Sequence, residues 1–289
     1  MQRVRSSDGV DLALHDLGGD GPPLLLTHAT GFCGPVWRPV AARLADHCHC
    51  WAPDLRGHGE SVTPDGLDFR WDGFADDVLA VVDHLRVELG HDGPLVAAGH
   101  SKGGAALLLA EQRRPGTFSR LYCYEPVVFP GEPIDPDDTG ASGTGRGNHL
   151  ADGALRRRAS FASAGEAFAN FSSKPPLNVL RSDALRAYID GGFREEADDS
   201  VTLRCRPVDE SQVYRMGAQH GAFAHMGDVA IPVTIATGAV DAVGPAAFAP
   251  AIADARPHGE LVVFDDLGHF GPLQDPDAVA DDMLRVLAG

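Results

Sequence analysis

The sequence predicts an α/β fold, in which a mostly parallel central sheet carries helices on both faces and an inserted helical cap. Two stretches, residues 24–124 and 232–287, alternate short continuous apolar runs with segments of helical spacing. Apolar runs without polar alternation are typical of parallel strands that are buried on both faces. Residues 127–228 break the alternation. We therefore expect a core formed by residues 1–126 and 229–289, with residues 127–228 as its cap.

In the first half, short apolar runs bounded by turn residues predict the strands of the sheet. These strands are expected at residues 24–29, 48–53, 95–99 and 121–124. Helical spacing predicts helices at residues 35–45, 74–89 and 103–113. The second of these helices has one apolar stripe, as expected of a helix packed on a sheet. The stripe consists of Val78, Val81, Val82, Leu85 and Leu89. The glycine-rich residues 54–61 are expected to form a loop.

The second half resumes the alternation after the cap. Strands are expected at residues 232–237 and 261–264, and helices at 246–255 and 275–287. Within the cap, residues 129–147 are rich in Pro, Gly and Asp, which predicts a long mobile connection. Helical patches follow at residues 150–161, 164–171, 183–189 and 209–223. Ser163 and Glu166 have the spacing of a capping box.

Composition excludes several classes of function. The 289 residues carry a formal net charge of −17. Such an acidic protein lacks the basic surface that nucleic acid or an anionic membrane requires, and no apolar run approaches the roughly 20 residues of a membrane helix. Charged residues within positions 1–20 leave no apolar signal segment, so we expect a cytoplasmic protein. With nucleic acid and membrane excluded, the expected partner is a small-molecule substrate. The 5 cysteines are irregularly spaced, which favours reduced thiols.

The segment Gly99-His100-Ser101-Lys102-Gly103 is the strongest indication of chemistry. It follows an apolar strand and precedes a helical segment, which is the context that makes a G-x-S-x-G motif credible. The glycines let the chain turn sharply, so the Ser101 hydroxyl projects above the sheet, and the helix N-terminus favours negative charge beside it. Ser101 is therefore the candidate nucleophile.

A serine nucleophile needs a base, and the base needs a carboxylate that orients it. His269 follows the last expected strand and is the candidate base. Asp241 follows the strand before that one and is the preferred acid. Glu125 follows an earlier strand and is an alternative acid, and two further aspartates lie beside the histidine, Asp265 and Asp266. These strand ends share the edge of a parallel sheet at which ligands bind.

With these motifs in this order, the sequence resembles the α/β-hydrolase family. The resemblance rests on the serine motif, on residues 24–32, on Asp54-Leu55-Arg56-Gly57-His58-Gly59-Glu60-Ser61 and on the order Ser101, Asp241, His269.

The resemblance implies an oxyanion hole. One donor would be the backbone N–H of Lys102, and the other that of Thr30 or Ala29. His28-Ala29 stands where relatives commonly have His-Gly. For the Lys102 side chain, one hypothesis is that its ammonium pairs with an anionic substrate. The preferred interpretation is that the side chain points to water or bonds a residue of the cap.

Two further motifs are interpreted as structural. His47-Cys48-His49-Cys50 would alternate between the two faces of a strand, so its side chains cannot converge on a metal, and no metal site is expected. The glycine-rich residues 143–147 follow no strand and are expected to be flexible chain instead of a nucleotide-binding loop.

These residues predict a serine hydrolase that cleaves a carboxylic ester, thioester or lactone through an acyl-enzyme and needs no cofactor. Phe32, Trp37 and Phe129 are expected to line the substrate pocket, with the cap setting substrate choice. Family relatives use the same triad for carbon–carbon bond hydrolysis and cofactor-free perhydrolysis, and a non-enzymatic small-molecule binder on this fold is a further alternative. The sequence indicates neither the substrate nor the oligomeric state.

Overall fold

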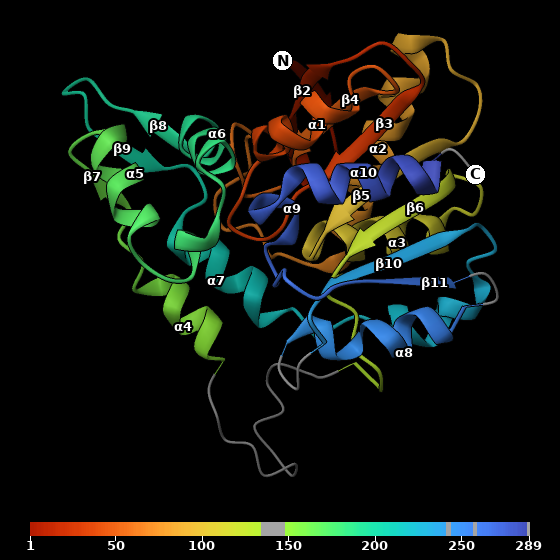
Figure 1. The fold of residues 1–289 in the computed structure, drawn as a ribbon. Helices are drawn as coiled ribbons and strands as arrows, with labels where there is room; N and C mark the ends of the chain where they lie inside the picture. Colours follow the sequence, from red (N-terminus) through yellow and green to blue (C-terminus); the bar gives the residue numbers. More distant parts are fainter. Residues whose placement is uncertain (134–147, 241–243, 257–258, 288–289) are drawn as a thin grey trace.

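The central sheet is mostly parallel, as predicted. The computed structural model describes residues 1–133, 148–240, 244–256 and 259–287. Eight strands form one sheet in the order β1-β2-β4-β3-β5-β6-β10-β11 (Figure 1). The pairs β1/β2 and β2/β4 are antiparallel, and the other neighbours are parallel.

The strands expected from the sequence are all present, within a few residues of their predicted bounds. The central sheet consists of β1 Gln2–Arg5, β2 Asp11–Gly18, β3 Pro23–Thr27, β4 His49–Asp54, β5 Leu95–His100, β6 Phe118–Tyr124, β10 Val233–Gly238 and β11 Gly259–Phe264. The antiparallel strands β1 and β2 are additions that the sequence pattern does not predict.

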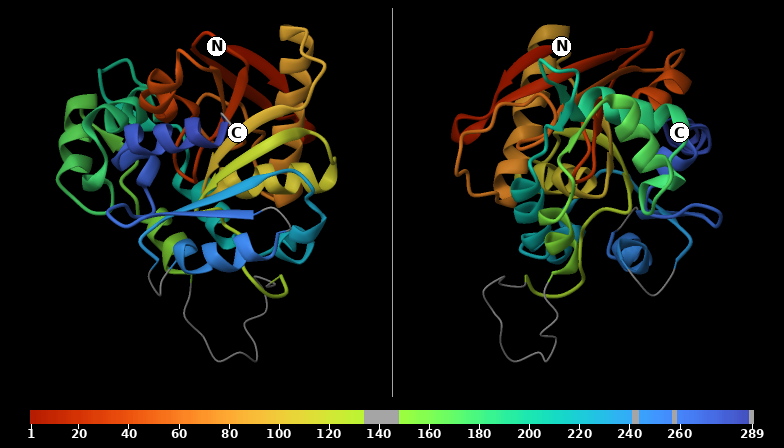
Figure 2. Two further views of the ribbon diagram at one scale, coloured as in Figure 1. Left: turned by 45° about the vertical axis from the view of Figure 1, so that its right-hand side comes forward. Right: turned by 90° about the vertical axis from the view of Figure 1, so that its left-hand side faces the viewer.

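Helices cover both faces of the sheet (Figure 2). One face carries α2 Trp71–Leu89, α3 Lys102–Arg113 and α8 Ala249–Asp254, and the other carries α1 Arg38–Leu44 and α10 Pro276–Leu287. The predicted stripe of α2 is buried from Val78 to Leu85, because it packs against the sheet and α3. Shorter helices join these elements: η1 Ser7–Gly9, η2 Gly34–Trp37, η3 Leu177–Val179, η4 Ala222–Asp228, η5 Pro245–Phe248 and α9 Gly271–Gln274.

The segment between β6 and β10 gathers beside one end of the sheet (Figure 1). Its elements are α4 His149–Leu155, β7 Ser160–Phe161, α5 Ala164–Ser172, α6 Ser182–Gly192, β8 Phe193–Glu195, β9 Val201–Leu203 and α7 Pro207–Arg215. Three of them form a small antiparallel sheet in the order β7-β9-β8, so this segment is less purely helical than predicted.

Two predicted helices of this segment are shorter than expected. The helix predicted at 150–161 ends at Leu155, because Ser160 and Phe161 pair with β9. The helix predicted at 209–223 ends at Arg215, since Gly217 and Gly221 disfavour its continuation. The predicted cap of α5 is confirmed: the Ser163 hydroxyl accepts the Glu166 N–H at 3.1 Å.

Several further expectations concern the chain as a whole. All 5 cysteines are buried and unpaired. None of the helices within the described ranges is both long and apolar enough to span a membrane. Most of the connection predicted at 129–147, including the glycine-rich residues 143–147, lies outside the described residues.

Candidate active site

Ser101 occupies a strained turn between β5 and α3. Its backbone has φ 55° and ψ −117°, which a residue with a side chain rarely adopts. The turn is held in place because the Ser101 N–H donates to the Tyr124 carbonyl at 2.9 Å and its carbonyl accepts the Val127 N–H at 3.2 Å. A Cβ atom on Gly99 would lie 2.6 Å from the backbone nitrogen of Gly104, so the tight turn requires glycine there. The sharp strand–turn–helix geometry predicted for the motif is present.

The register of the sheet places Ser101 and Glu125 side by side. His100 of β5 is paired with Tyr124 of β6, so the residues that follow the two strands lie at the same edge. Tyr124 is in turn paired with Ala236 of β10. Glu125 therefore stands between the turn that carries the serine and the end of β10.

Glu125 and His269 form a short hydrogen bond. The Nδ1 atom of His269 lies 2.6 Å from Oε2 of Glu125, whose side chain is buried. The second oxygen, Oε1, accepts the Gly238 N–H at 2.9 Å and the Thr237 hydroxyl at 3.1 Å. These three donors hold the Glu125 carboxylate in one orientation. This bond assigns the proton of the imidazole to Nδ1 and leaves Nε2 as its free acceptor.

Two bonds between backbone and side chain fix the loop that carries His269. Nε2 of His100 donates to the His269 carbonyl at 2.7 Å, and the Tyr124 hydroxyl donates to the Gly268 carbonyl at 2.8 Å. The histidine is thereby attached to the residue that precedes Ser101. Ser101 is only 6% exposed, and within the described ranges its hydroxyl has no hydrogen-bond partner. The hydrogen bond from Ser101 to a base is therefore not formed here, and catalytic hydrogen bonds of this kind often tighten only when substrate is bound.

The preferred acid of the sequence analysis, Asp241, lies outside the described residues. Its alternative, Glu125, is the carboxylate that contacts His269. A signal for Glu125 was present in the sequence, because it directly follows its strand just as Ser101 does. Sequence spacing alone does not show that β6 lies between β5 and β10.

The loop after β3 is oriented by His28. The Nδ1–H of His28 donates to the Ala29 carbonyl at 2.8 Å, and its Nε2 accepts the Leu55 N–H at 3.0 Å. In a trans peptide the C=O and N–H point in opposite directions. Because the Ala29 carbonyl is turned toward the His28 ring, the Thr30 N–H points away from it.

The preferred interpretation of Lys102 is wrong in both its forms. The side chain is fully buried and does not point to water, and its hydrogen-bond partner is His58 and not a residue of 127–228. Its Nζ atom lies 3.3 and 3.4 Å from the two ring nitrogens of His58, and 4.8 Å from the centroid of the Phe74 ring. Helix α2 and the loop after β4 enclose this side chain, because its ammonium contacts Phe74 and His58. Burial lowers the pKa of Lys102 to about 7.

A cavity of about 390 Å³ opens beside the loop after β3. Its lining residues are Thr30, Gly31, Phe32, His149, Leu150, Gly153, Ala154, Arg157, Asn170, Phe171, Lys174, Pro175, Pro176, Leu177, Tyr188, Glu210, Tyr214 and Phe270. One side of it holds a largely buried ion pair, in which Nη1 of Arg157 contacts both Glu210 oxygens at 2.6 and 2.8 Å. Most of its lining comes from the segment between β6 and β10, which mixes aromatic and polar side chains.

The three residues expected to line a substrate pocket have different surroundings. Phe32 lines the cavity and stacks edge-on against Phe270, with ring centroids 5.8 Å apart. Trp37 is buried in the core with α1 and does not belong to the cavity lining. Phe129 packs against Phe248 with ring centroids 5.4 Å apart, also away from that lining.

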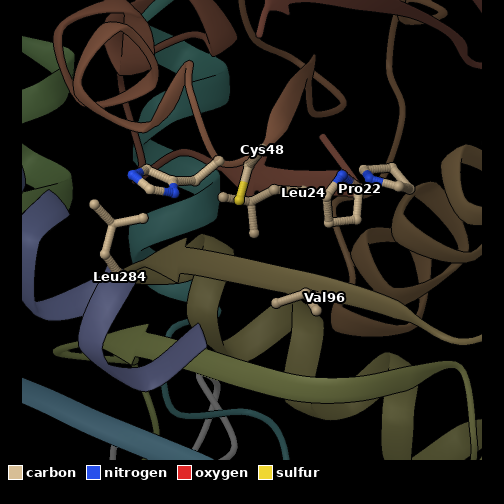
Figure 3. Close-up of a pocket in the computed structure, with 7 residues that line it drawn as sticks. Pro22, Leu24, Cys48, Val96 and Leu284 are labelled. Atoms are coloured by element: carbon tan, nitrogen blue, oxygen red, sulfur yellow. The ribbon is translucent and has the colours of Figure 1, made fainter. Parts of the chain in front are cut away.

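A second hollow lies at the opposite edge of the sheet (Figure 3). It encloses about 220 Å³ near the first residues of β3, β4 and β5, and Cys48 and Leu284 contribute to its wall. The His47–Cys50 motif has structural partners here, since His49 stacks on Trp51 and bonds Asp16 at 2.7 Å. In the described part of the chain no cluster of three or more His, Cys, Asp or Glu residues is arranged to hold a metal.

Comparisons with known proteins identify several relatives. A probable protein phosphatase methylesterase 1 from Caenorhabditis elegans is 35% identical over 100 residues, which cover 34% of this chain and 27% of that protein. The chain thus matches less than a third of that relative's length. An (E)-2-((N-methylformamido)methylene)succinate hydrolase from Acinetobacter baylyi is 24% identical over 266 residues, covering 90% of this chain and 88% of that protein.

The solved structure of E-2-(acetamidomethylene)succinate hydrolase has a TM-score of 0.77 at 20% sequence identity, and covers 100% of this chain and 98% of that chain. The fold is therefore that of an α/β hydrolase. The sequence pattern of the alpha/beta hydrolase family matches residues 24–282, and the chain belongs to that family.

Proposed function

We propose that the protein is a serine hydrolase that cleaves a carboxylic ester, thioester or lactone through an acyl-enzyme. The observation that carries this proposal is the Glu125–His269 hydrogen bond of 2.6 Å beside the strained turn at Ser101. Nucleophile, base and acid are thus assigned to Ser101, His269 and Glu125. The methylesterase relative, whose name describes ester cleavage, supports the choice of bond.

The proposed reaction has two halves. The Ser101 oxygen attacks the carbonyl carbon while Nε2 of His269 takes its proton, and the tetrahedral intermediate then expels the alcohol, which receives that proton. A water molecule next attacks the acyl-enzyme, gives its proton to His269 and releases the carboxylic acid, and the proton returns to Ser101. Throughout, Glu125 keeps the imidazole in the tautomer with Nδ1 protonated and stabilises its charged form.

Two backbone donors are proposed to stabilise the oxyanion. One is the N–H of Lys102 in the first turn of α3, where the helix dipole favours negative charge. The other is the N–H of Thr30, because the bond from His28 turns the Ala29 carbonyl in the opposite direction. Of the two residues considered for the second donor, Thr30 is therefore preferred to Ala29.

Residues 127–228 are proposed to form the cap of this active site. They supply most of the lining of the 390 Å³ cavity, while Phe32 and Phe270 supply the part near the sheet. An aromatic wall next to a few polar groups suits a small organic acyl group. The cap is therefore where we place the determinants of substrate choice.

Labelling with a fluorophosphonate probe tests the assignment of the nucleophile. The probe loses fluoride when an activated serine oxygen attacks its phosphorus, so wild-type protein should be labelled and Ser101→Ala should not. Ser172→Ala, in the exposed helix α5, is the matched control and should label as the wild type does. Labelling that persists in Ser101→Ala, with both variants folded by circular dichroism, would refute the proposal.

A substrate panel tests the bond that is cleaved. We expect turnover of short-chain p-nitrophenyl esters, with thioesters and lactones compared in the same assay, and loss of turnover in Ser101→Ala. A protein that is labelled by the probe but cleaves none of these substrates would redirect the proposal to another reaction of the same triad. A protein that is neither labelled nor active would favour a non-enzymatic binder.

A further inference from the structure

Lys102 places a positive charge in the protein interior one residue after the proposed nucleophile. Its side chain is only 1% exposed. The ammonium contacts the face of Phe74 and the ring of His58, and no carboxylate in the described residues forms an ion pair with it. A buried ammonium without a paired anion is costly, so its presence calls for a role.

The two histidines between Lys102 and the loop after β3 are neutral hydrogen-bonding groups. The Nδ1–H of His58 donates to the Arg56 carbonyl at 2.8 Å, which leaves Nε2 to accept from the ammonium at 3.4 Å. The ring of His28, which orients the Ala29 carbonyl, lies 5.1 Å from that of His58. Burial lowers the pKa of both histidines well below the ordinary value, and the charge of Lys102 lowers it further. The cluster therefore carries a single cation, on Lys102.

Four acidic groups face Lys102, and none of them forms an ion pair with it in the described residues. Three are carboxylates from β4, α2 and α7, and the fourth is the Cys205 thiol, whose pKa burial raises well above its ordinary value. Each carboxylate has its own partner, in the pairs Asp54–His15 (2.9 Å), Asp77–Arg56 (2.8 Å) and Glu210–Arg157 (2.6 Å). The charge of Lys102 is thus left largely uncompensated in a region of low dielectric.

We propose that the Lys102 ammonium is a positioning group for the reaction, a positive charge held in place behind the oxyanion hole. Because only the protonated amine carries this charge, the reaction rate depends on the protonation of Lys102. It acts by stabilising the negative charge that develops on the carbonyl oxygen when Ser101 attacks, and by holding His58 and the loop beyond it in place. The proposal rests on the proposed function, since it needs Ser101 as the nucleophile. A preorganised charge in a site that excludes water is effective because it need not reorient during the reaction.

The direction of the pH dependence follows from burial. Burial lowers the pKa of Lys102 from 10.5 to about 7, so the ammonium is present below that pH and lost above it. We therefore expect the rate of reaction at Ser101 to fall as the pH rises through this value. A hydrolase without such a cation would reach a plateau on the alkaline side, because His269 acts in its neutral form.

The test compares fluorophosphonate labelling rates of wild type, Lys102→Met and Lys102→Arg across a range of pH. We expect the wild-type rate to pass through a maximum and fall by about tenfold on the alkaline side. This is less than the roughly 10²–10³-fold that one direct oxyanion-hole donor contributes, because the ammonium lies behind the hole. Lys102→Met should be about tenfold slower at the maximum and show no alkaline fall. Lys102→Arg keeps its charge at all these pH values, so its alkaline fall should also be absent.

A second measurement reports the protonation directly, without activity. The chain has only two lysines, Lys102 and Lys174, so protein labelled with ¹³C at lysine Cε gives two signals, and Lys102→Met identifies one of them. We expect that signal to titrate near neutral pH. Absence of this titration would overturn the proposal, as would an unchanged alkaline fall in either Lys102 variant. Should Lys102→Met fail to fold, Lys102→Arg and the titration decide the question.

These outcomes separate this proposal from the proposed function. Loss of labelling in Ser101→Ala together with an unaltered pH profile in the Lys102 variants would leave the serine hydrolase intact and reject the role of the ammonium. Labelling that survives Ser101→Ala would reject both.

Discussion

Glu125 is the residue whose conformation most directly reflects the proposed chemistry. Its φ of 42° lies in a region that residues with side chains rarely occupy, and its N–H is held by the Ala236 carbonyl at 2.8 Å. Strained backbone of this kind persists where the surrounding structure determines it, and it concentrates at functional sites. The strain at Glu125 and at Ser101 occurs at the same edge of the sheet, where the His269 imidazole lies.

Replacing Glu125 by Gln tests its role as the acid. The amide cannot stabilise the charged imidazole and can present an N–H to Nδ1, which favours the wrong tautomer. We therefore expect kcat on a p-nitrophenyl ester to fall by about 10³–10⁴-fold with little change in fold. Steady-state kinetics and circular dichroism provide the measurement.

Asp241→Asn is the matched control for this substitution, since Asp241 is the other acid that the sequence favours. We expect it to change kcat by less than about threefold, because Nδ1 of His269 already bonds Glu125. A large loss in Asp241→Asn and a small one in Glu125→Gln would exchange the two assignments.

The sequence alone was sufficient to nominate Ser101 and His269, because each follows an apolar strand and so lies at the edge of a parallel sheet where ligands bind. It could not choose between Glu125 and Asp241, since both follow strands of the same sheet. The choice depends on strand order and on the pairing of His100 with Tyr124, which are properties of the assembled sheet. The buried position of Lys102 was missed for a related reason: it depends on α2 and on the loop after β4 lying over the start of α3.

At the scale of elements, the close packing of α3 against β3 holds the serine turn. Gly103, in the first turn of α3, lies so near Thr27 that a Cβ atom would collide with the Thr27 carbonyl. Backbone atoms cannot move aside to relieve such a clash, whereas the end of a flexible side chain can. The two elements can approach this closely only because position 103 has no side chain.

Gly103→Ala should therefore separate α3 from β3. We expect the free energy of unfolding to fall by about 2–4 kcal/mol and the labelling rate at Ser101 to drop as well, because the N–H of Lys102 moves with the helix. Urea unfolding followed by tryptophan fluorescence measures the first effect, and the fluorophosphonate assay measures the second.

Gly153→Ala is the control in another helix. Gly153 of α4 is exposed, and a Cβ atom there would meet no atom within 4 Å. We expect this variant to gain up to about 1 kcal/mol from helix propensity. Equal changes in the free energy of unfolding of the two glycine variants would show that close packing at Gly103 does not matter.

Elements with a long periodic signal were predictable, and short or mixed ones were not. The apolar stripe of α2 and the continuous apolar runs of β3, β5 and β10 are visible in the sequence itself and predict these elements without knowledge of the fold. By contrast, β2 contains the buried polar residue His15, whose Nε2 atom hydrogen-bonds Asp54 at 2.9 Å. A segment that looks polar in sequence therefore becomes part of the sheet because of a partner that is distant in sequence. The strands β7, β8 and β9 have two or three residues each, and only their mutual pairing defines them.

For the whole molecule, the buried Lys102 links stability to pH. Its pKa is lowered from 10.5 in an unfolded chain to about 7 in the native protein. Between these values the unfolded chain binds a proton that the native protein does not, so the contribution of Lys102 to the free energy of unfolding rises with pH across this window. That contribution is fully present above the unfolded pKa and is lost as the pH falls through about 7.

Lys102→Met removes this dependence, because methionine has no proton to release. We expect the variant to be more stable than wild type below neutral pH, and its advantage to shrink by about 4 kcal/mol as the pH rises from about 7 to about 10. Denaturant unfolding of both proteins at several pH values measures the difference, in which the other titrating groups cancel. A difference that does not vary with pH would contradict the lowered pKa.

The order of the proposed catalytic groups along the chain means that a single break could separate them into two fragments. Ser101, both oxyanion donors and Glu125 precede the exposed residues 130–133, and His269 alone comes after them. A polypeptide opened there yields one fragment with nucleophile and acid, and another that contributes a single imidazole. Turnover by the mixture would then report fragment complementation, because the imidazole arrives only when β10 docks on β6.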